Sequence, residues 1–282
     1  MAPDRSHETN DPGPIRALGV VHLNVVLEDF DETIAHYADL YGGTVVLDIP
    51  QPAWHACLMD VGHVLFELFV PHELFLHTRY GPHFLGVEYL VDDMEHVRQV
   101  VAARGIRIAR DLDVALHTNA SDCHGVSLEF YTDTFVDNDD LLDTPMQPAA
   151  YWRDEHPIGF TGLRGFTVAV TDLTRALDDF TAVLDAEVRD EARRPAVSGT
   201  AVGLDVGGAV MELVAPDGDG QLERHLLAHS EGIRSVVFGV RDLDRARAHF
   251  ARKGVELVPG TAPDALAVPP EQNLGVIFEL TE

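Results

Sequence analysis

The sequence predicts an α+β protein of two tandem domains, each built from a pair of βαβββ modules. The first observation behind this is a repeated opening, in which a short apolar strand runs into a helix that starts at an aspartate. It occurs at residues 21–37, 85–101, 164–180 and 234–250. The second observation is that each copy closes with a strand that carries a glutamate: Glu67, Glu129, Glu212 and Glu279. Openings about 60 to 80 residues apart are too widely spaced for a short solenoid repeat.

Each module is predicted to continue from its opening strand into one helix and then into two or three further strands. In the first module Ile34, Tyr37 and Leu40 lie at helical spacing, and acidic residues fill the first turn, where the helix dipole favours them. The helices of the second and fourth modules are expected to end at Gly105 and Gly254, which are regular C-cap signals.

The domain boundaries follow from composition. Residues 1–15 are polar and are expected to form a disordered tail. Residues 16–133 form the first predicted domain and residues 160–282 the second. The segment 134–159 is acidic, rich in proline and without a sustained period, so it is predicted to be a linker that packs Tyr151 and Trp152 onto a domain.

Composition limits the classes of partner. The chain has 282 residues, 46% of them hydrophobic, and a formal net charge of −27. Such acidity disfavours nucleic acids and anionic membranes, which both need a basic footprint. No apolar run approaches the roughly 18 residues that span a bilayer, and the polar N-terminus lacks the apolar region of a signal peptide. We expect a cytoplasmic protein, monomeric or homodimeric, that binds a small-molecule substrate.

Aligning the modules by their helix-start aspartates separates the first domain from the second. His22 lies seven residues before Asp29 in the first opening strand. The same offset falls on Gly86, Gly165 and Ser235 in the other three modules. The closing glutamate, in contrast, is present in all four copies.

A second pair of histidines also belongs only to the first domain. His55 lies twelve residues before Glu67, and His117 lies twelve residues before Glu129. The same step from the other two closing glutamates reaches Thr200 and Ala267. His55 and His117 are therefore candidates for contact with a substrate or with the ligands; the alternative is that they are ordinary surface residues of a strand.

Histidine and carboxylate side chains together suit a divalent metal such as Zn, Ni, Co, Mn or Fe(II). His22, Glu67 and Glu129 are the first candidates for its ligands. Since Gly86 has no side chain to offer, two residues compete for the fourth position. Glu88 shares a strand face with Gly86 and is either a ligand or a catalytic base, because an unpaired carboxylate within an apolar strand is costly. His83 lies in a Gly-Pro turn and could swing in.

These residues resemble the vicinal oxygen chelate superfamily, which includes glyoxalase I, methylmalonyl-CoA epimerase, extradiol dioxygenases and bleomycin-resistance proteins. The resemblance is carried by the segments VHLNVVLEDFDETIAHYADLYGG and DCHGVSLEFYTD. It implies that two modules pair into an open, cupped β-barrel around one metal, with ligands at His22, Glu67 and Glu129. The family's remaining ligand position falls on Gly86. The second domain then resembles a degenerate, metal-free copy that closes the site, binds a second ligand or mediates assembly.

The resemblance leaves three functions open. A lyase or isomerase of the glyoxalase or epimerase type would move a proton with a glutamate beside a metal-bound carbonyl, on a small carbonyl-containing metabolite. An extradiol ring-cleaving dioxygenase would need Fe(II) held by two histidines and one carboxylate. A metal-free protein would bind or sequester a small molecule, as antibiotic-resistance relatives do. Glu67 favours the first of these functions.

Overall fold

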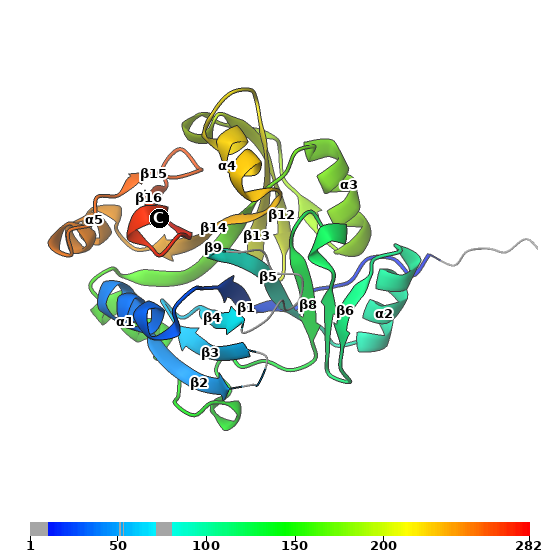
Figure 1. The fold of residues 1–282 in the computed structure, drawn as a ribbon, viewed down its shortest axis with the longest axis horizontal. Helices are drawn as coiled ribbons and strands as arrows, with labels where there is room; N and C mark the ends of the chain where they lie inside the picture. The colour runs from blue at the N-terminus through cyan, green and yellow to red at the C-terminus, as the bar shows by residue number, and fades with distance from the viewer. Residues whose placement is uncertain (1–10, 51, 53, 72–80) are drawn as a thin grey trace, which may run out of the picture.

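The computed structural model describes residues 11–50, 52, 54–71 and 81–282, and it folds into two sheets of strands flanked by helices (Figure 1). The first sheet has eight strands in the order β2-β3-β4-β1-β5-β8-β7-β6. The second has the order β10-β12-β13-β9-β14-β17-β16-β15, with β11 paired to β12. In the described residues the edge strands of a sheet do not pair with each other, so each sheet is an open cup.

Two modules build the first sheet. The first module consists of β1 (Gly19–Val26), α1 (Phe30–Tyr41), β2 (Thr44–Pro50), β3 (Trp54–Asp60) and β4 (Leu65–Pro71). The second consists of β5 (His83–Leu90), α2 (Met94–Ala103), β6 (Ile108–Asp111), β7 (Ala115–Thr118) and β8 (Ser127–Tyr131). Strands β1 and β5 join the modules as an antiparallel pair at the centre of the sheet.

The second sheet repeats this plan with additions. The third module consists of β9 (Phe160–Ala169), α3 (Leu173–Val183), β10 (Glu187–Val188), β11 (Ala192–Arg194), β12 (Gly199–Val206) and β13 (Ala209–Pro216). The fourth consists of β14 (Gly232–Val240), α5 (Leu243–Arg252), β15 (Val258–Pro259), β16 (Leu266–Val268) and β17 (Ile277–Thr281). An extra helix, α4 (Gln221–His229), connects the two modules. The prediction of two tandem domains made of paired βαβββ modules is confirmed.

The helix-start aspartates act as N-caps in all four modules. The side chains of Asp29, Asp93, Asp172 and Asp242 each accept a hydrogen bond from the backbone N–H three residues later, at 2.8–3.0 Å. Such a cap satisfies one of the donors left unpaired in the first turn. The aspartates that reveal the repeat in the sequence therefore have a local structural role.

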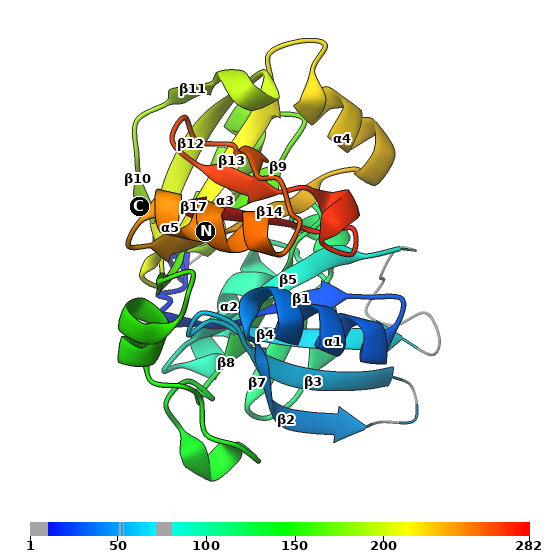
Figure 2. The same ribbon diagram turned by 90° about the vertical axis from the view of Figure 1, so that its left-hand side faces the viewer.

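The two sheets pack back to back through an aromatic core, with one sheet below the other in Figure 2. Residues of the two sheets alternate between this core and the opposite face, because successive side chains of a strand point to opposite sides. Leu23 and Val25 of β1 lie in the shared core, as do Phe166 and Val168 of β9. The concave faces of the two cups, which carry the intervening residues, therefore point away from each other.

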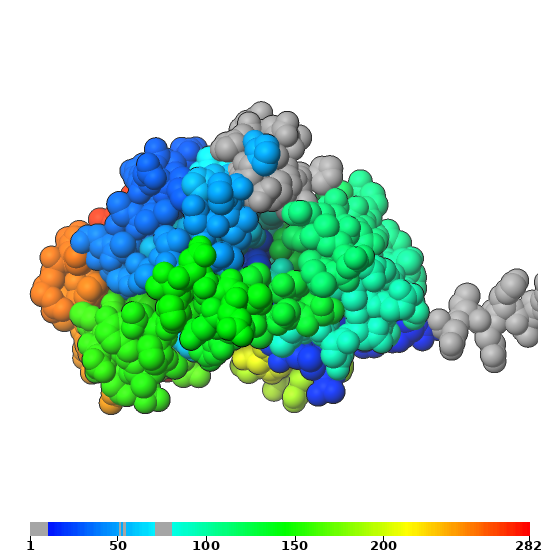
Figure 3. Space-filling model, turned by 90° about the horizontal axis from the view of Figure 1, so that it is seen from below, coloured from blue at the N-terminus to red at the C-terminus, as the bar shows by residue number. Residues whose placement is uncertain are grey.

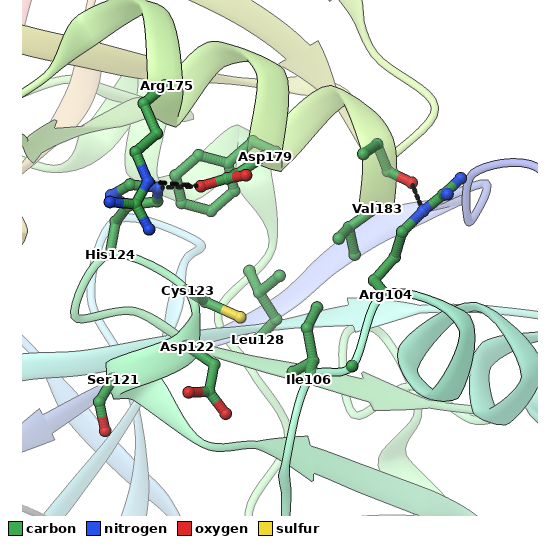
Figure 4. A pocket seen from close by; sticks show the side chains of 13 residues that line it. Arg104, Ile106, Ser121, Asp122, Cys123, His124, Leu128, Arg175, Asp179 and Val183 are labelled. Atoms are coloured by element: carbon green, nitrogen blue, oxygen red, sulfur yellow. Dashed lines mark hydrogen bonds and ion pairs between the residues drawn. The ribbon is translucent and has the colours of Figure 1, made fainter.

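Helices from the two domains meet at both sides of the molecule. On one side α1 contacts the second domain, where the Tyr41 hydroxyl donates to Asn273 Oδ1 at 2.6 Å. On the other side the Arg104 guanidinium, just after α2, donates to the Ala182 carbonyl at 2.9 Å. A groove of about 360 Å³ lies there, and Figure 4 shows His124 of the first domain reaching Asp179 of α3 across it.

The segment between the domains lies against the first domain. Trp152, in a single π-helical turn (Tyr151–Glu155), is fully buried, and its Nε1 donates to Asp60 Oδ2 at 3.1 Å. The predicted packing of Trp152 is thus confirmed. The expected tail extends less far than residue 15, because Ile15 is buried and forms a bridge to Leu184 at the end of α3. The other boundaries stay predictions, and residues 1–10 of the expected tail lie outside the described residues.

No helix within the described residues combines the length and the apolar character needed to cross a membrane.

Candidate metal centre

The central strands of the first sheet bring four ionisable side chains together on its concave face. His22 of β1 pairs directly opposite Glu88 of β5. On β1, Asn24 lies two residues further along the same face and is the register partner of Glu67 on β4. On the other side of the pair, Glu88 is in register with Glu129 on β8. Strand pairing alone therefore brings together residues that lie far apart in the sequence.

The two ring nitrogens of His22 face different carboxylates of this cluster. Nδ1 lies 3.3 Å from Glu88 Oε1, whereas Nε2 lies 3.6 Å from Glu67 Oε2 and 4.0 Å from Glu129 Oε2. The ligand atoms of His22, Glu88 and Glu129 all lie within 4.8 Å of one another, and all three residues are buried. Glu67 is more open, with 23% of its side chain exposed.

Neutral polar side chains and a second histidine complete the surroundings of the carboxylates. The Asn24 amide donates to Glu67 Oε2 at 2.8 Å and to Glu129 Oε2 at 3.2 Å. The Ser127 hydroxyl donates to Glu129 Oε1 at 3.4 Å. His117 of β7 pairs opposite Glu129, and its Nδ1 lies 3.0 Å from Glu129 Oε1. The sequence places His117 at this site correctly, although its role stays a prediction.

Burial and crowded charge shift the pKa values of the cluster. Burial disfavours the charged imidazole of His22, but the nearby carboxylates of Glu88, Glu67 and Glu129 outweigh it and raise the pKa to about 9. Burial raises the pKa of Glu88 to about 7; His22 opposes this shift, while the like charges of Glu129 and Glu67 add to it. Burial also works against the charged form of Glu129, yet His117 and His22 hold its pKa below the usual value.

The donor set fits a divalent metal. Among the described residues, both ring nitrogens of His22, Oε1 of Glu88, Oδ1 of Asn24 and Nδ1 of His117 are buried without a hydrogen bond. Buried polar atoms are rarely left unpaired, and an imidazole with carboxylate oxygens is a set that binds Zn, Ni, Co, Mn or Fe(II). His22, Glu67, Glu88 and Glu129 are the residues that could hold the ion.

The two candidates for the position vacated by Gly86 have different locations. Glu88 lies in the cluster, whereas His83, at the start of β5, does not. The His83 ring lines a small pocket with Phe84 and Arg234, and its Nδ1 lies 2.8 Å from the Gly81 carbonyl oxygen. The structure therefore does not bring His83 to the predicted metal site. Gly86 itself is fixed by close packing, because a Cβ there would lie 2.2 Å from the Ser127 carbonyl oxygen.

The expectation that His55 faces the site is wrong. Its ring stacks on Phe30 at the start of α1 with centroids 4.0 Å apart, and its Nε2 lies 2.7 Å from Asp48 Oδ1. The twelve-residue step fails because the β3–β4 hairpin is shorter than the β7–β8 connection. Glu67 pairs opposite Leu58, nine residues earlier, and His55 falls on the helix face of the sheet.

Comparison with known proteins agrees with this architecture. Residues 162–265 match the model of the Glyoxalase/Bleomycin resistance protein/Dioxygenase superfamily. A triple mutant of 4-hydroxymandelate synthase from Streptomyces coelicolor superposes with a TM-score of 0.73 and 13% identity, covering 94% of this chain and 92% of that one. Residues 162–265 thus match the vicinal oxygen chelate superfamily, and the chain as a whole has the fold of the full-length structure.

Two further solved structures are similar. The 2,3-dioxygenase LapB from Pseudomonas sp. KL28 has a TM-score of 0.63 and 13% identity, again over 94% of this chain and 92% of that one. Methylmalonyl-CoA epimerase from Mycobacterium tuberculosis is 28% identical over 43% of this chain and 87% of its own, with a TM-score of 0.41. No curated protein matches the sequence. At these identities the full-length matches establish the fold of the chain and leave its activity open.

Within the vicinal oxygen chelate fold, the second cup has different residues at the corresponding register positions. Gly165 stands where the first cup has His22, Thr167 where it has Asn24, and Val237 where it has Glu88. The closing glutamates Glu212 and Glu279 remain in place. No group of potential ligands is found in the described part of the second cup.

Sequence reasoning assigned no role to two neighbours of the candidate ligands in the first cup. Asn24 was recognisable as sharing a strand face with His22, and that alternation was the only signal for it. Phe135, whose ring centroid lies 6.5 Å from that of His22, follows the first domain in the linker. Figure 3 looks onto this face and shows a recess between the first module (blue) and the second (blue-green), with the green linker along one side.

Proposed function

We propose that the protein is a divalent-metal-dependent lyase or isomerase of the glyoxalase or epimerase type. Its substrate would be a small carbonyl-containing metabolite, and its reaction a metal-assisted proton transfer. The observation that carries this proposal is Glu88, a buried carboxyl group with a pKa of about 7 beside the candidate ligands. A group that gains and loses a proton near neutral pH is suited to general acid–base catalysis.

His22, Glu67 and Glu129 would hold the ion, because Glu67 and Glu129 both lie on the Nε2 side of the imidazole. A divalent metal bound there would act as a Lewis acid that withdraws charge from a substrate oxygen. His117 and Ser127, which contact Glu129 Oε1, would orient this carboxylate.

Glu88 would act from the other side of the ring. Its Oε1 is 3.3 Å from His22 Nδ1, whereas the other two carboxylates face Nε2. As a base, Glu88 would take a proton from the carbon next to the substrate carbonyl and return it to the product. The alternative role of Glu88, as a metal ligand, gives a different result in the experiment below.

A dioxygenase is the second candidate, and the position of His117 favours it. His22, His117 and Glu129 together provide two imidazoles and one carboxylate, the set used by Fe(II) oxygenases. Two of the similar solved structures are 4-hydroxymandelate synthase and a 2,3-dioxygenase. A third candidate, metal-free binding or sequestration of a small molecule, predicts protein without metal.

Metal analysis of the purified protein tests the site. We expect one divalent ion per chain, lost from His22→Ala and from Glu129→Ala because the remaining groups cannot complete the coordination. His55→Ala is the matched control, since this histidine lies on the other face of the sheet and should leave the metal content unchanged. Full occupancy in the two ligand variants, with folding intact, would disprove the site.

Deuterium exchange tests the reaction. In D2O the wild type should introduce deuterium next to the carbonyl of at least one compound in a panel of small α-hydroxy carbonyl compounds and thioesters, followed by NMR. Glu88→Gln should keep its metal and lose about 10²–10⁴-fold in exchange rate if Glu88 is the base. Loss of metal from Glu88→Gln would assign it as a ligand. Iron in the protein, with oxygen uptake on catechols and no exchange, would replace the proposal by the dioxygenase.

A further inference from the structure

The concave face of the second sheet encloses a pocket of about 230 Å³ that the function proposed for the first cup does not use. Its floor is formed by the residues that replace the metal cluster: Gly165, Thr167 and Val237. Because the sheets pack back to back, this pocket opens on the opposite side of the molecule from His22. It is smaller than the roughly 300–1,000 Å³ of drug-sized ligand sites, so it would suit a small metabolite.

The two glutamates of this pocket are already neutralised within the protein. Glu279 accepts hydrogen bonds from Ser235 Oγ at 2.7 Å and from the Thr261 hydroxyl at 2.6 Å and backbone N–H at 2.7 Å, and it pairs with buried Arg234 at 3.2 Å. Glu212 pairs with Arg194 at 2.5 Å. Each of the two carboxylates is thus paired with an arginine of its own, Glu279 with Arg234 and Glu212 with Arg194.

Three arginines line the pocket, and they differ in their partners. Arg194 forms an ion pair with Glu212, and Arg189 forms a bidentate ion pair with Asp205 at 2.6 and 2.8 Å. Arg164 has no ion pair among the described residues, although it also lines the pocket. One guanidinium charge is therefore left over on the wall of a pocket whose other charges are matched.

The backbone beneath Arg164 has room for its side chain. A Cβ on Gly239 of β14 would lie 2.3 Å from Thr161 Oγ1 and 2.7 Å from Arg164 Nε, so the arginine lies across the strand directly over this glycine. Gly165 and Val237 next to it offer an uncharged surface. An unmatched guanidinium beside an apolar floor is the arrangement expected for an anionic group with a hydrocarbon body.

We propose that the second cup is a binding site for a small organic monoanion, with the carboxylate of the ligand on Arg164 and its apolar body over Val237. This site is independent of the metal chemistry proposed for the first cup. It gives the second domain a ligand of its own, whereas its position on the far side of the molecule prevents it from closing the first site.

Benzoate is a suitable probe, titrated calorimetrically into the full-length protein, with neutral benzamide as its uncharged analogue. We expect benzoate to bind and benzamide to bind much more weakly. Arg164→Gln should weaken benzoate binding about 10- to 100-fold, the usual effect of losing a hydrogen bond to a charged group. Arg247→Gln, which removes an exposed arginine of α5, is the matched control and should have no effect.

His22→Ala distinguishes the two cups, because benzoate could also bind a metal. This variant should bind benzoate as the wild type does. Absence of benzoate binding to the wild type, equal binding by Arg164→Gln, or loss of binding in His22→Ala would each overturn the proposal. Circular dichroism of Arg164→Gln should match the wild type, since the side chain is exposed; Gly239→Ala, which displaces Arg164, provides a second variant with the same expected loss.

Discussion

Removing the ring of Phe278 should lower the stability of both domains against unfolding, although this residue belongs only to the second domain. Phe278 is fully buried in β17. Its ring contacts five other aromatic rings, with centroids 5.2–6.1 Å apart. One of these is Phe238 of the second domain, and the other four belong to the first domain: Tyr37, Tyr41, Phe66 and Phe84. Phe278→Ala leaves a cavity among rigid neighbours, and such substitutions cost about 3–5 kcal/mol. That is a large part of the roughly 5–15 kcal/mol that stabilises a typical domain.

The two tryptophans make the coupling measurable. Trp54 belongs to β3, and the buried Trp152 donates to Asp60 of the first domain, so unfolding of the first domain should change the tryptophan emission. In urea, Phe278→Ala should lower the midpoint of the tryptophan transition together with that of the far-UV circular dichroism transition. Leu227→Ala, at a side chain of α4 that is 82% exposed, is the control and should change stability by less than about 0.5 kcal/mol.

The coupling would be refuted by a tryptophan midpoint that stays at the wild-type value while circular dichroism shows a separate, earlier step. That result would mean that the second domain unfolds alone and that the shared aromatic core contributes little to the first.

Two further predictions concern the first cup. Metal affinity should rise about tenfold per pH unit between about pH 7 and 9, because His22 with a pKa of about 9 must lose its proton to bind; zinc titrations at several pH values that show no such slope would contradict this. Gly86→Ala should destabilise the protein by about 1–3 kcal/mol in thermal unfolding, since its Cβ would meet the Ser127 carbonyl oxygen at 2.2 Å, whereas Gly19→Ala has open space and should be nearly neutral.

The module architecture could be predicted from the sequence because it rests on local signals. Aspartate caps and alternating strands recur in every copy, and each depends on residues only a few positions apart. His22 and Glu129 were found for the same reason, since both occupy positions fixed by the strand period. Glu88 was found from a missing side chain at Gly86, which drew attention to the next residue on that face.

The errors arose where the answer depended on loop length or on packing between domains. Counting twelve residues from a glutamate reaches the correct partner for His117 but not for His55, because the shorter β3–β4 hairpin changes the register by three residues. The prediction for His83 failed because this residue begins β5 beyond an irregularity in the pairing with β1, where the alternation of side chains along the strand is broken. The back-to-back arrangement of the cups follows from contacts between distant aromatic side chains, which no local pattern in the sequence reveals.

The opposed orientation of the cups also bears on how such a duplicated chain can change over time. Substitutions on the concave face of one sheet do not touch the concave face of the other, so one copy can lose its imidazole and gain arginines while its sister keeps its chemistry. The aromatic core between the sheets has less freedom, because rings such as Phe278 contact side chains of both domains. Variation among descendants of this architecture should therefore concentrate on the two outer surfaces and leave the middle layer unchanged.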